Sequence, residues 1–195
     1  GAGVLMARSV EFGRRYNVPI IVKSTFTNNK GTVVKEKTME EAIVSGVTHN
    51  DKEVKFTLFG VPDQPGIAGT VFGSLSEIGT NVDMIVQNVS KESITDISFT
   101  APSEQQKDVE DTLKNISKQL DAKGYDVDEN IARISIIGAG MKSESGVASK
   151  MFKTLGDNKI NISMISTSPI RVSCVISSND IEKALNVLHE EFITN

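Results

Sequence analysis

The sequence predicts an α+β protein built from two ferredoxin-like modules of βαββαβ order, with the first module inserted in the second. The leading observation is a repeat: residues 56–88 read FTLFGVPDQPGIAGTVFGSLSEIGTNVDMIVQN, and residues 134–168 read ISIIGAGMKSESGVASKMFKTLGDNKINISMISTS. The other observations are the order of strand-like and helix-like patterns in each copy and the absence of a last strand pattern from the second. A repeat of this length indicates one supersecondary unit used twice.

The two copies align with one short difference in loop length. Gly60 matches Gly138, and the later matches share one constant offset: Gly66/Gly146, Phe72/Phe152, Leu75/Leu155, Asn81/Asn161 and Met84/Met164. Two such copies create an interface with a pseudo-twofold axis, where two equivalent ligand sites can form.

The first module is predicted over residues 50–130. Alternating apolar residues indicate strands, apolar stripes of helical spacing indicate helices, and Pro65 suits a first helical turn. The predicted strands cover residues 54–61, 81–88, 94–100 and 125–127, and the helices cover residues 67–78 and 103–120.

The second module is predicted over residues 131–195 together with residues 41–49. Strands are expected at residues 133–137, 161–166 and 170–177, and helices at residues 146–155 and 180–192. No strand pattern follows the last helix, which would leave a sheet edge unpaired. The unassigned strand pattern at residues 41–48 is therefore expected to complete this sheet, which makes the first module an insertion.

Residues 1–37 differ from the repeated part. Helical spacing of apolar residues covers residues 2–16, Asn17-Val18-Pro19 ends that helix, and residues 19–24 form a short strand pattern. A helix and a strand cannot bury both their faces alone, so this segment is expected to be the edge of a larger α/β domain or a strap. The opening glycine favours a fragment, a processed form or a product with a tag remnant.

Composition excludes several classes of function. The net charge of −4 provides no basic field for nucleic acid, and no apolar run reaches membrane-spanning length. Cys174 is the single cysteine, which excludes an internal disulfide framework or a multi-cysteine metal site and favours the cytoplasm. His49 and His189 have no catalytic motif beside them, and Gly138-Ala139-Gly140 lacks the third glycine of a dinucleotide fingerprint.

Two turns before predicted helices are the candidate anion sites. They are Asp63-Gln64-Pro65-Gly66 and Ser143-Glu144-Ser145-Gly146. Free backbone N–H groups at a helix start suit a carboxylate or a phosphate. The alternative is a plain turn in which Asp63 or Gln64 caps the helix. Asn81 and Asn161 begin equivalent strands, either as turn residues or as a frame for a ligand between the copies.

Taken together, these segments resemble the regulatory part of the bacterial aspartate kinases, which carries tandem ACT domains. The resemblance rests on GVPDQPGIAGTVF (60–72), NVDMIVQNVS (81–90), TDISFT (95–100), GAGMKSESGVASKMF (138–152) and NISMISTSPIRVSCVI (161–176). Residues 1–34 are similar to the C-terminal edge of that family's amino-acid-kinase domain. Ser145 and Pro169 depart from the pattern at the second site.

The resemblance implies allosteric feedback control of an enzyme that phosphorylates aspartate with ATP, exerted by lysine, threonine or both. ATP and Mg²⁺ would bind the kinase domain, so this chain is expected to hold no cofactor and to be inactive alone. The implied partners are a second copy, bound through the ACT domains, and the catalytic domain or subunit. No nucleic acid and no membrane are expected as partners. A dimerisation module with vestigial pockets remains the alternative, and an enzyme with an unrecognised site is a second one.

Two effector sites are expected between the copies, each combining a helix start from one copy with a strand start from the other. The resemblance implies Asp63, Gly66, Ile67, Ala68, Gln87, Asn161 and Ile162 for site one. It implies Met141, Ser143, Gly146, Val147, Ala148, Asn81, Val82 and Thr167 for site two.

Overall fold

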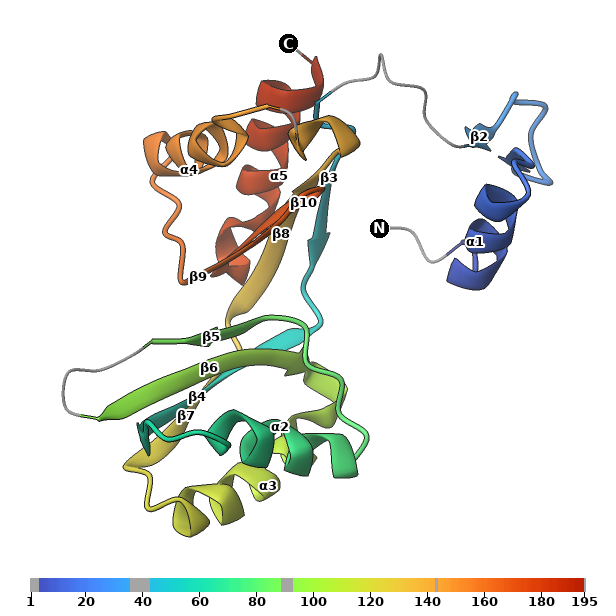
Figure 1. Cartoon of the computed structure of the whole chain (residues 1–195). Helices are drawn as coiled ribbons and strands as arrows, with labels where there is room; N and C mark the ends of the chain where they lie inside the picture. The colour runs from blue at the N-terminus through green and yellow to red at the C-terminus, as the bar shows by residue number, and fades with distance from the viewer. Residues whose placement is uncertain (1–3, 36–42, 89–92, 143, 195) are drawn as a thin grey trace. The chain divides into compact units, whose positions relative to one another are not determined.

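The computed structural model describes residues 4–35, 43–88, 93–142 and 144–194. They fall into two compact units, Gly1–Ile43 and Val44–Asn195, and each unit is considered by itself (Figure 1). The first unit contains helix α1 (Ala7–Arg15) and an antiparallel hairpin of β1 (Ile20–Val22) and β2 (Thr32–Val34). The hairpin's second strand was not predicted, and the helix begins later than residue 2 because Met6 at its start is extended.

The second unit contains two four-stranded antiparallel sheets, in the orders β5-β6-β4-β7 and β3-β8-β10-β9. Two helices pack on one face of each sheet (Figure 1). This arrangement confirms the predicted pair of ferredoxin-like modules.

The first module follows the βαββαβ order. Its elements are β4 (Glu53–Pro62), α2 (Ile67–Glu77), β5 (Ile85–Gln87), β6 (Ile94–Pro102), α3 (Gln106–Gln119) and β7 (Gly124–Asp128), with a 3₁₀ turn at Ser103–Gln105. Phe56 and Phe99 stack on neighbouring strands at 5.3 Å between ring centroids, and Phe72 of α2 meets Phe99 edge-on at 5.7 Å. These apolar contacts fix α2 on the sheet.

The second module repeats this order without a strand after its last helix. Its elements are β8 (Ile131–Ile137), α4 (Val147–Asp157), β9 (Met164–Ser168), β10 (Arg171–Ser177) and α5 (Ile181–His189), with 3₁₀ turns at Ala139–Lys142 and Ser178–Asp180 and a π-helical end at Glu190–Thr194. Its core joins both helices to the sheet through fully buried residues such as Ile134, Met151, Cys174 and Leu188.

The missing strand of the second module comes from upstream, as predicted. Strand β3 (Gly46–Asn50) pairs antiparallel with β8, with His49 opposite Ile134. The first module therefore lies between two adjacent strands of the second sheet. The strand was expected at residues 41–48, of which 41 and 42 lie outside the described residues. It begins only at Gly46, because Val44 turns into the core and the Ser45 amide donates to the Ile137 carbonyl.

The second strand of each module is shorter at its start than predicted. Residues 81–88 were expected to form one strand, yet β5 covers only Ile85–Gln87. Before it, the Asp83 amide donates to the Thr100 carbonyl, and the Met84 amide donates to the Thr100 hydroxyl instead of to a strand carbonyl. In the second module, β9 likewise begins at Met164 and not at residue 161.

Candidate functional site

Helices α2 and α4 begin in the same way in the two modules. Gly66 and Gly146 precede them with φ values of 98° and 92°, a left-handed conformation that favours glycine. Among the described residues, no side chain caps either helix, so the expected alternative of an Asp63 or Gln64 cap is not seen. In α2 the Ile67 amide donates to the Gln64 carbonyl at 3.3 Å. The remaining first-turn N–H groups of α2 and those of α4 suit an anion.

In the second module this helix start forms one wall of a cavity of about 410 Å³. Five residues predicted for site two line it: Met141, Gly146, Val147, Ala148 and Thr167. Ser143, also predicted, lies outside the described residues. Glu144, which belongs to the turn predicted as a candidate anion site, also lines the cavity. Three further residues line it without having been assigned to site two: Ser168, Pro169 and Val172.

Glu144 gives this cavity an acidic group beside the helix start. The helix N–H groups suit a carboxylate, and the Glu144 carboxylate suits an ammonium group. Thr167 and Ser168 add hydroxyl groups, while Met141, Val147 and Val172 provide apolar wall. This combination matches the chemistry of a small zwitterion with a short side chain.

In the first module, the corresponding residues also gather at one end of the sheet. Asp63 follows β4 directly, and its amide donates to the Ser93 carbonyl at 2.8 Å. Gln87 ends β5 opposite Ile97 of β6, the strand that also pairs with the end of β4. Gly66, Ile67 and Ala68 then begin α2. The helix-start half of site one is thus assembled by β4, β5 and α2.

The other half of each predicted site is the segment that precedes the second strand of a module. This strand-start half lies at the other end of the sheet. The segment around Asn161 and Ile162 leads to Ser163, whose amide donates to the Val175 carbonyl at 2.8 Å. Val175 is buried with Met84, Ile131 and Met164 in a cluster between the modules, called the junction cluster below. Strand β8 leaves this cluster at Ile131 and ends at Ile137, about 20 Å away at roughly 3.3 Å per residue.

Asn81 lies at the same junction and lines a different cavity, of about 360 Å³, together with Asp83 and Arg133. Val82 packs against the core of the first module. A single chain therefore does not bring Asn81 and Val82 to the cavity beside α4. By the same geometry it does not bring Asn161 and Ile162 to the start of α2.

Other chemistry finds no support in the described part of the chain. It contains no group of three or more His, Cys, Asp or Glu side chains arranged to hold a metal ion. Cys174 is fully buried, and burial raises the pKa of its thiol to about 12, so the reactive thiolate is disfavoured. No helix among the described residues is long and apolar enough to cross a membrane.

Comparison with known proteins adds family evidence to this geometry. Residues 55–121 and residues 134–192 each match a family described as the ACT domain. The regulatory subunit of aspartate kinase from Thermus thermophilus, in a ligand-free form, is 35% identical with a TM-score of 0.72. The match covers 76% of this chain and 99% of that one. This chain belongs to the aspartate kinases.

Two further aspartate kinases are similar to this chain. A structure of aspartokinase α and β subunits is 38% identical with a TM-score of 0.72, covering 76% of this chain and 98% of the other. Aspartate kinase from Pseudomonas fluorescens is 44% identical over 98% of this chain and 47% of its own length. The chain thus spans about half the length of this curated relative, and its two modules are regulatory ACT domains.

Proposed function

We propose that this ACT region binds lysine, threonine or both and so imposes feedback inhibition on the phosphorylation of aspartate. The observation that carries the proposal is the cavity at the start of α4, where uncapped helix N–H groups, Glu144 and two hydroxyl groups converge. The effector's α-carboxylate lies at the helix start, and an ammonium group lies toward Glu144. In site one, Asp63 takes the place of Glu144 as the acidic partner.

A second copy completes each site. Because one chain keeps the helix-start and strand-start halves at opposite sheet ends, Asn81 and Asn161 reach an effector from a partner chain. The edge strands β5 and β9 offer surfaces for this pairing, since Ile85 is 50% exposed and Ile165 is 43% exposed at equivalent positions. Unpaired strand edges with exposed apolar side chains favour association.

The catalytic step belongs to a kinase domain or subunit that this region controls in the cytoplasm. ATP and Mg²⁺ bind there, and the chain itself is inactive. An effector that bridges two chains favours one arrangement of them by its differential affinity, which is how it biases the kinase. Incubation of the purified chain with ATP and aspartate should yield no aspartyl phosphate above a blank without protein.

The deciding experiment is calorimetric titration of the chain with lysine and with threonine, each alone and in the presence of the other. At about one hundred times its dissociation constant, an effector should stabilise the fold by about 2.7 kcal/mol, which melting curves detect. The D-enantiomers are the matched control, because they keep charge and composition but change the geometry at the helix start.

The alternative is a dimerisation module with vestigial pockets, which the exposed edges of β5 and β9 favour. No heat of binding and no melting shift with either amino acid, in a chain that sediments as a dimer, would establish that alternative. Binding of an effector together with dimerisation supports the regulatory function.

A further inference from the structure

Arg133, Glu53 and Asp83 form an ionic cluster at the junction between the modules, called the Arg133 cluster below. The Arg133 guanidinium is 2.7 Å from Glu53 Oε1 and 2.6 Å from Asp83 Oδ2. The Arg133 and Glu53 side chains are only 8% and 6% exposed, whereas that of Asp83 is 45% exposed. Arg133 belongs to β8 of the second module, and both acids belong to the first.

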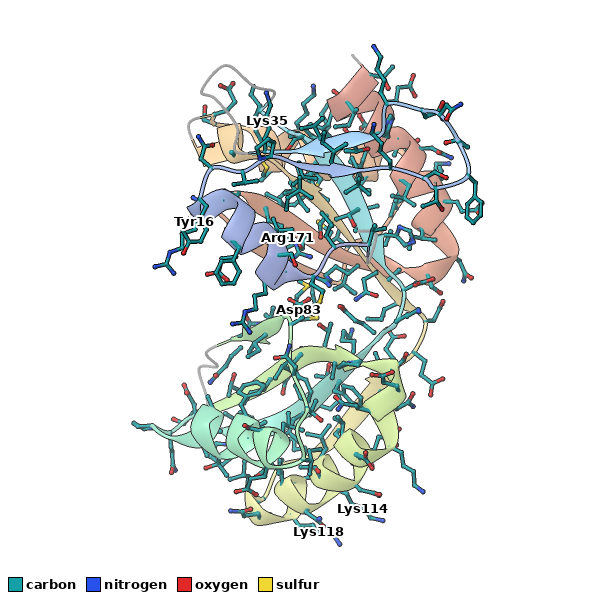
Figure 2. All side chains as sticks on the ribbon, turned by 90° about the vertical axis from the view of Figure 1, so that its right-hand side faces the viewer. Tyr16, Lys35, Asp83, Lys114, Lys118 and Arg171 are labelled. Atoms are coloured by element: carbon teal, nitrogen blue, oxygen red, sulfur yellow. The ribbon has the colours of Figure 1, made fainter. Side chains whose placement is uncertain are left out.

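Arg133 is held firmly on the Glu53 side. Glu53 begins β4, and its Oε1 also accepts a hydrogen bond from the Asn50 side chain at 2.6 Å. Leaving a buried charge without its partner is strongly destabilising, so this pair fixes where the guanidinium lies. The guanidinium then holds Asp83, which directly follows Asn81 and Val82. Figure 2 shows Asp83 where the two modules meet.

The repeat exposes an asymmetry in this contact. In the aligned copies, Arg133 corresponds to Lys55 and Asp83 corresponds to Ser163. Lys55 instead lies 4.0 Å from Asp128 of its own module. Ser163 donates from its amide and hydroxyl to Val175, also within its own module. Of the two aligned segments, the one at Asn81 is therefore tied across the junction by an ion pair, and the one at Asn161 is not.

We propose that Arg133 is a positioning residue that holds the Asn81–Val82 half of site two against the second module, so that the two effector sites are unequally coupled to the junction. This rests on the proposed function for its effector sites, but the tether itself is a property of the chain alone. Loss of Arg133 loosens the Asn81–Asp83 segment and weakens binding at site two. Site one, which uses Asn161, keeps its affinity.

The test compares Arg133→Met with Lys55→Met, the same change at the aligned position. Methionine keeps much of the apolar volume of arginine and lysine while removing the charge. Hydrogen exchange should accelerate at least tenfold at the Asp83 and Met84 amides in Arg133→Met. It should stay within twofold at Ser163 and Met164, and Lys55→Met should change neither segment.

A second variant guards against general destabilisation. Asp83→Asn leaves Arg133 with its buried partner Glu53 and removes only the ion pair that reaches the Asn81 segment. It should reproduce the faster exchange at Met84, and the double variant with Arg133→Met should be no faster than the more affected single variant. Equal acceleration of both segments in Asp83→Asn, or no change at Met84, would overturn the tether.

Measurements of effector binding separate this inference from the proposed function. In titrations followed at the Gly66 and Gly146 amides, Arg133→Met should weaken binding at Gly146 about tenfold and leave binding at Gly66 within twofold. Equal weakening at both glycines contradicts unequal coupling. If the unmodified chain binds neither lysine nor threonine, the proposed function fails, and the exchange data still decide the tether.

Discussion

Met84 and Met164, the aligned methionines of the two copies, lie in the same buried cluster between the modules. They are 3% and 5% exposed and pack with Ile131 and Val175. Aligned positions of the two copies therefore meet in an apolar contact, whereas the residues of the Arg133 cluster are not matched by an equivalent ion pair at their aligned positions Lys55 and Ser163.

Met84→Ala should destabilise the chain by about 2–5 kcal/mol, because it removes buried methylene groups and leaves a cavity between the modules. Denaturant unfolding measures the change. Met6→Ala is the control, since Met6 is 75% exposed and its loss should change the unfolding free energy by less than about 0.5 kcal/mol. Equal effects of the two substitutions would show that the junction cluster contributes little stability.

Deletion of residues 1–49 should unfold or aggregate the second module and spare the first. The deletion removes all of β3 except Asn50 and exposes the edge of β8 in the second sheet. Amide exchange should then lose protection at Ile134 and Ile136 and keep it at Phe56 and Phe99. Deletion of residues 1–43 is the control, because it removes the separate N-terminal unit and leaves β3 in place. Retained protection of β8 in the longer deletion would show that β3 is dispensable.

Asp63→Ala should weaken effector binding at site one about tenfold to a hundredfold. A charge-assisted hydrogen bond contributes about 1.5–3 kcal/mol, and each 1.4 kcal/mol is about a factor of ten. Calorimetry on the variant measures the loss, with Asp126→Ala on the edge strand β7 as a control for the change in net charge. Unchanged affinity in Asp63→Ala would leave this carboxylate as an ordinary residue of the turn before α2.

The Cys174 thiol should resist alkylation in the native chain and react fully in denaturant. Burial raises its folded-state pKa from 9.0 to about 12, so unfolding releases a proton between about pH 9 and pH 12. The thiol's contribution to stability is therefore present below about pH 9 and is lost as the pH rises toward 12. The unfolding free energy of the native chain should fall more steeply than that of Cys174→Ala in this range. Parallel pH dependence in the two proteins would contradict the raised pKa.

The sequence allowed the architecture to be predicted because the repeat supplies the same element order twice. The absence of a strand pattern after residue 192 then left the pattern at residues 41–48 to complete the second sheet, in which β3 pairs with β8. Hydrophobic periodicity was sufficient for these inferences, since each of these elements buries one face. The two helix starts could also be predicted, because an aligned glycine precedes each of them. Both glycines, Gly66 and Gly146, are left-handed in the structure.

What could not be predicted depends on contacts between residues far apart in the chain. The pairing of Arg133 with Glu53 and Asp83 carries no local signal, and the break before β5 arises where Asp83 and Met84 bond Thr100. The distance between the two halves of each proposed effector site also follows from strand direction and not from composition. Sequence patterns identify which residues are special, and the fold decides which of them meet.

The insertion of one module into the sheet of the other sets an order of events during synthesis. Strands β4 to β7 are complete once Asp128 has left the ribosome. Strand β3 cannot pair until β8 has been synthesised. When the first module folds, Lys55 pairs with Asp128 and brings the two ends of the insertion together. The long loop between β3 and β8 is then effectively short, which lowers the entropic cost of closing it. Slow folding of the early module would thus delay the late one.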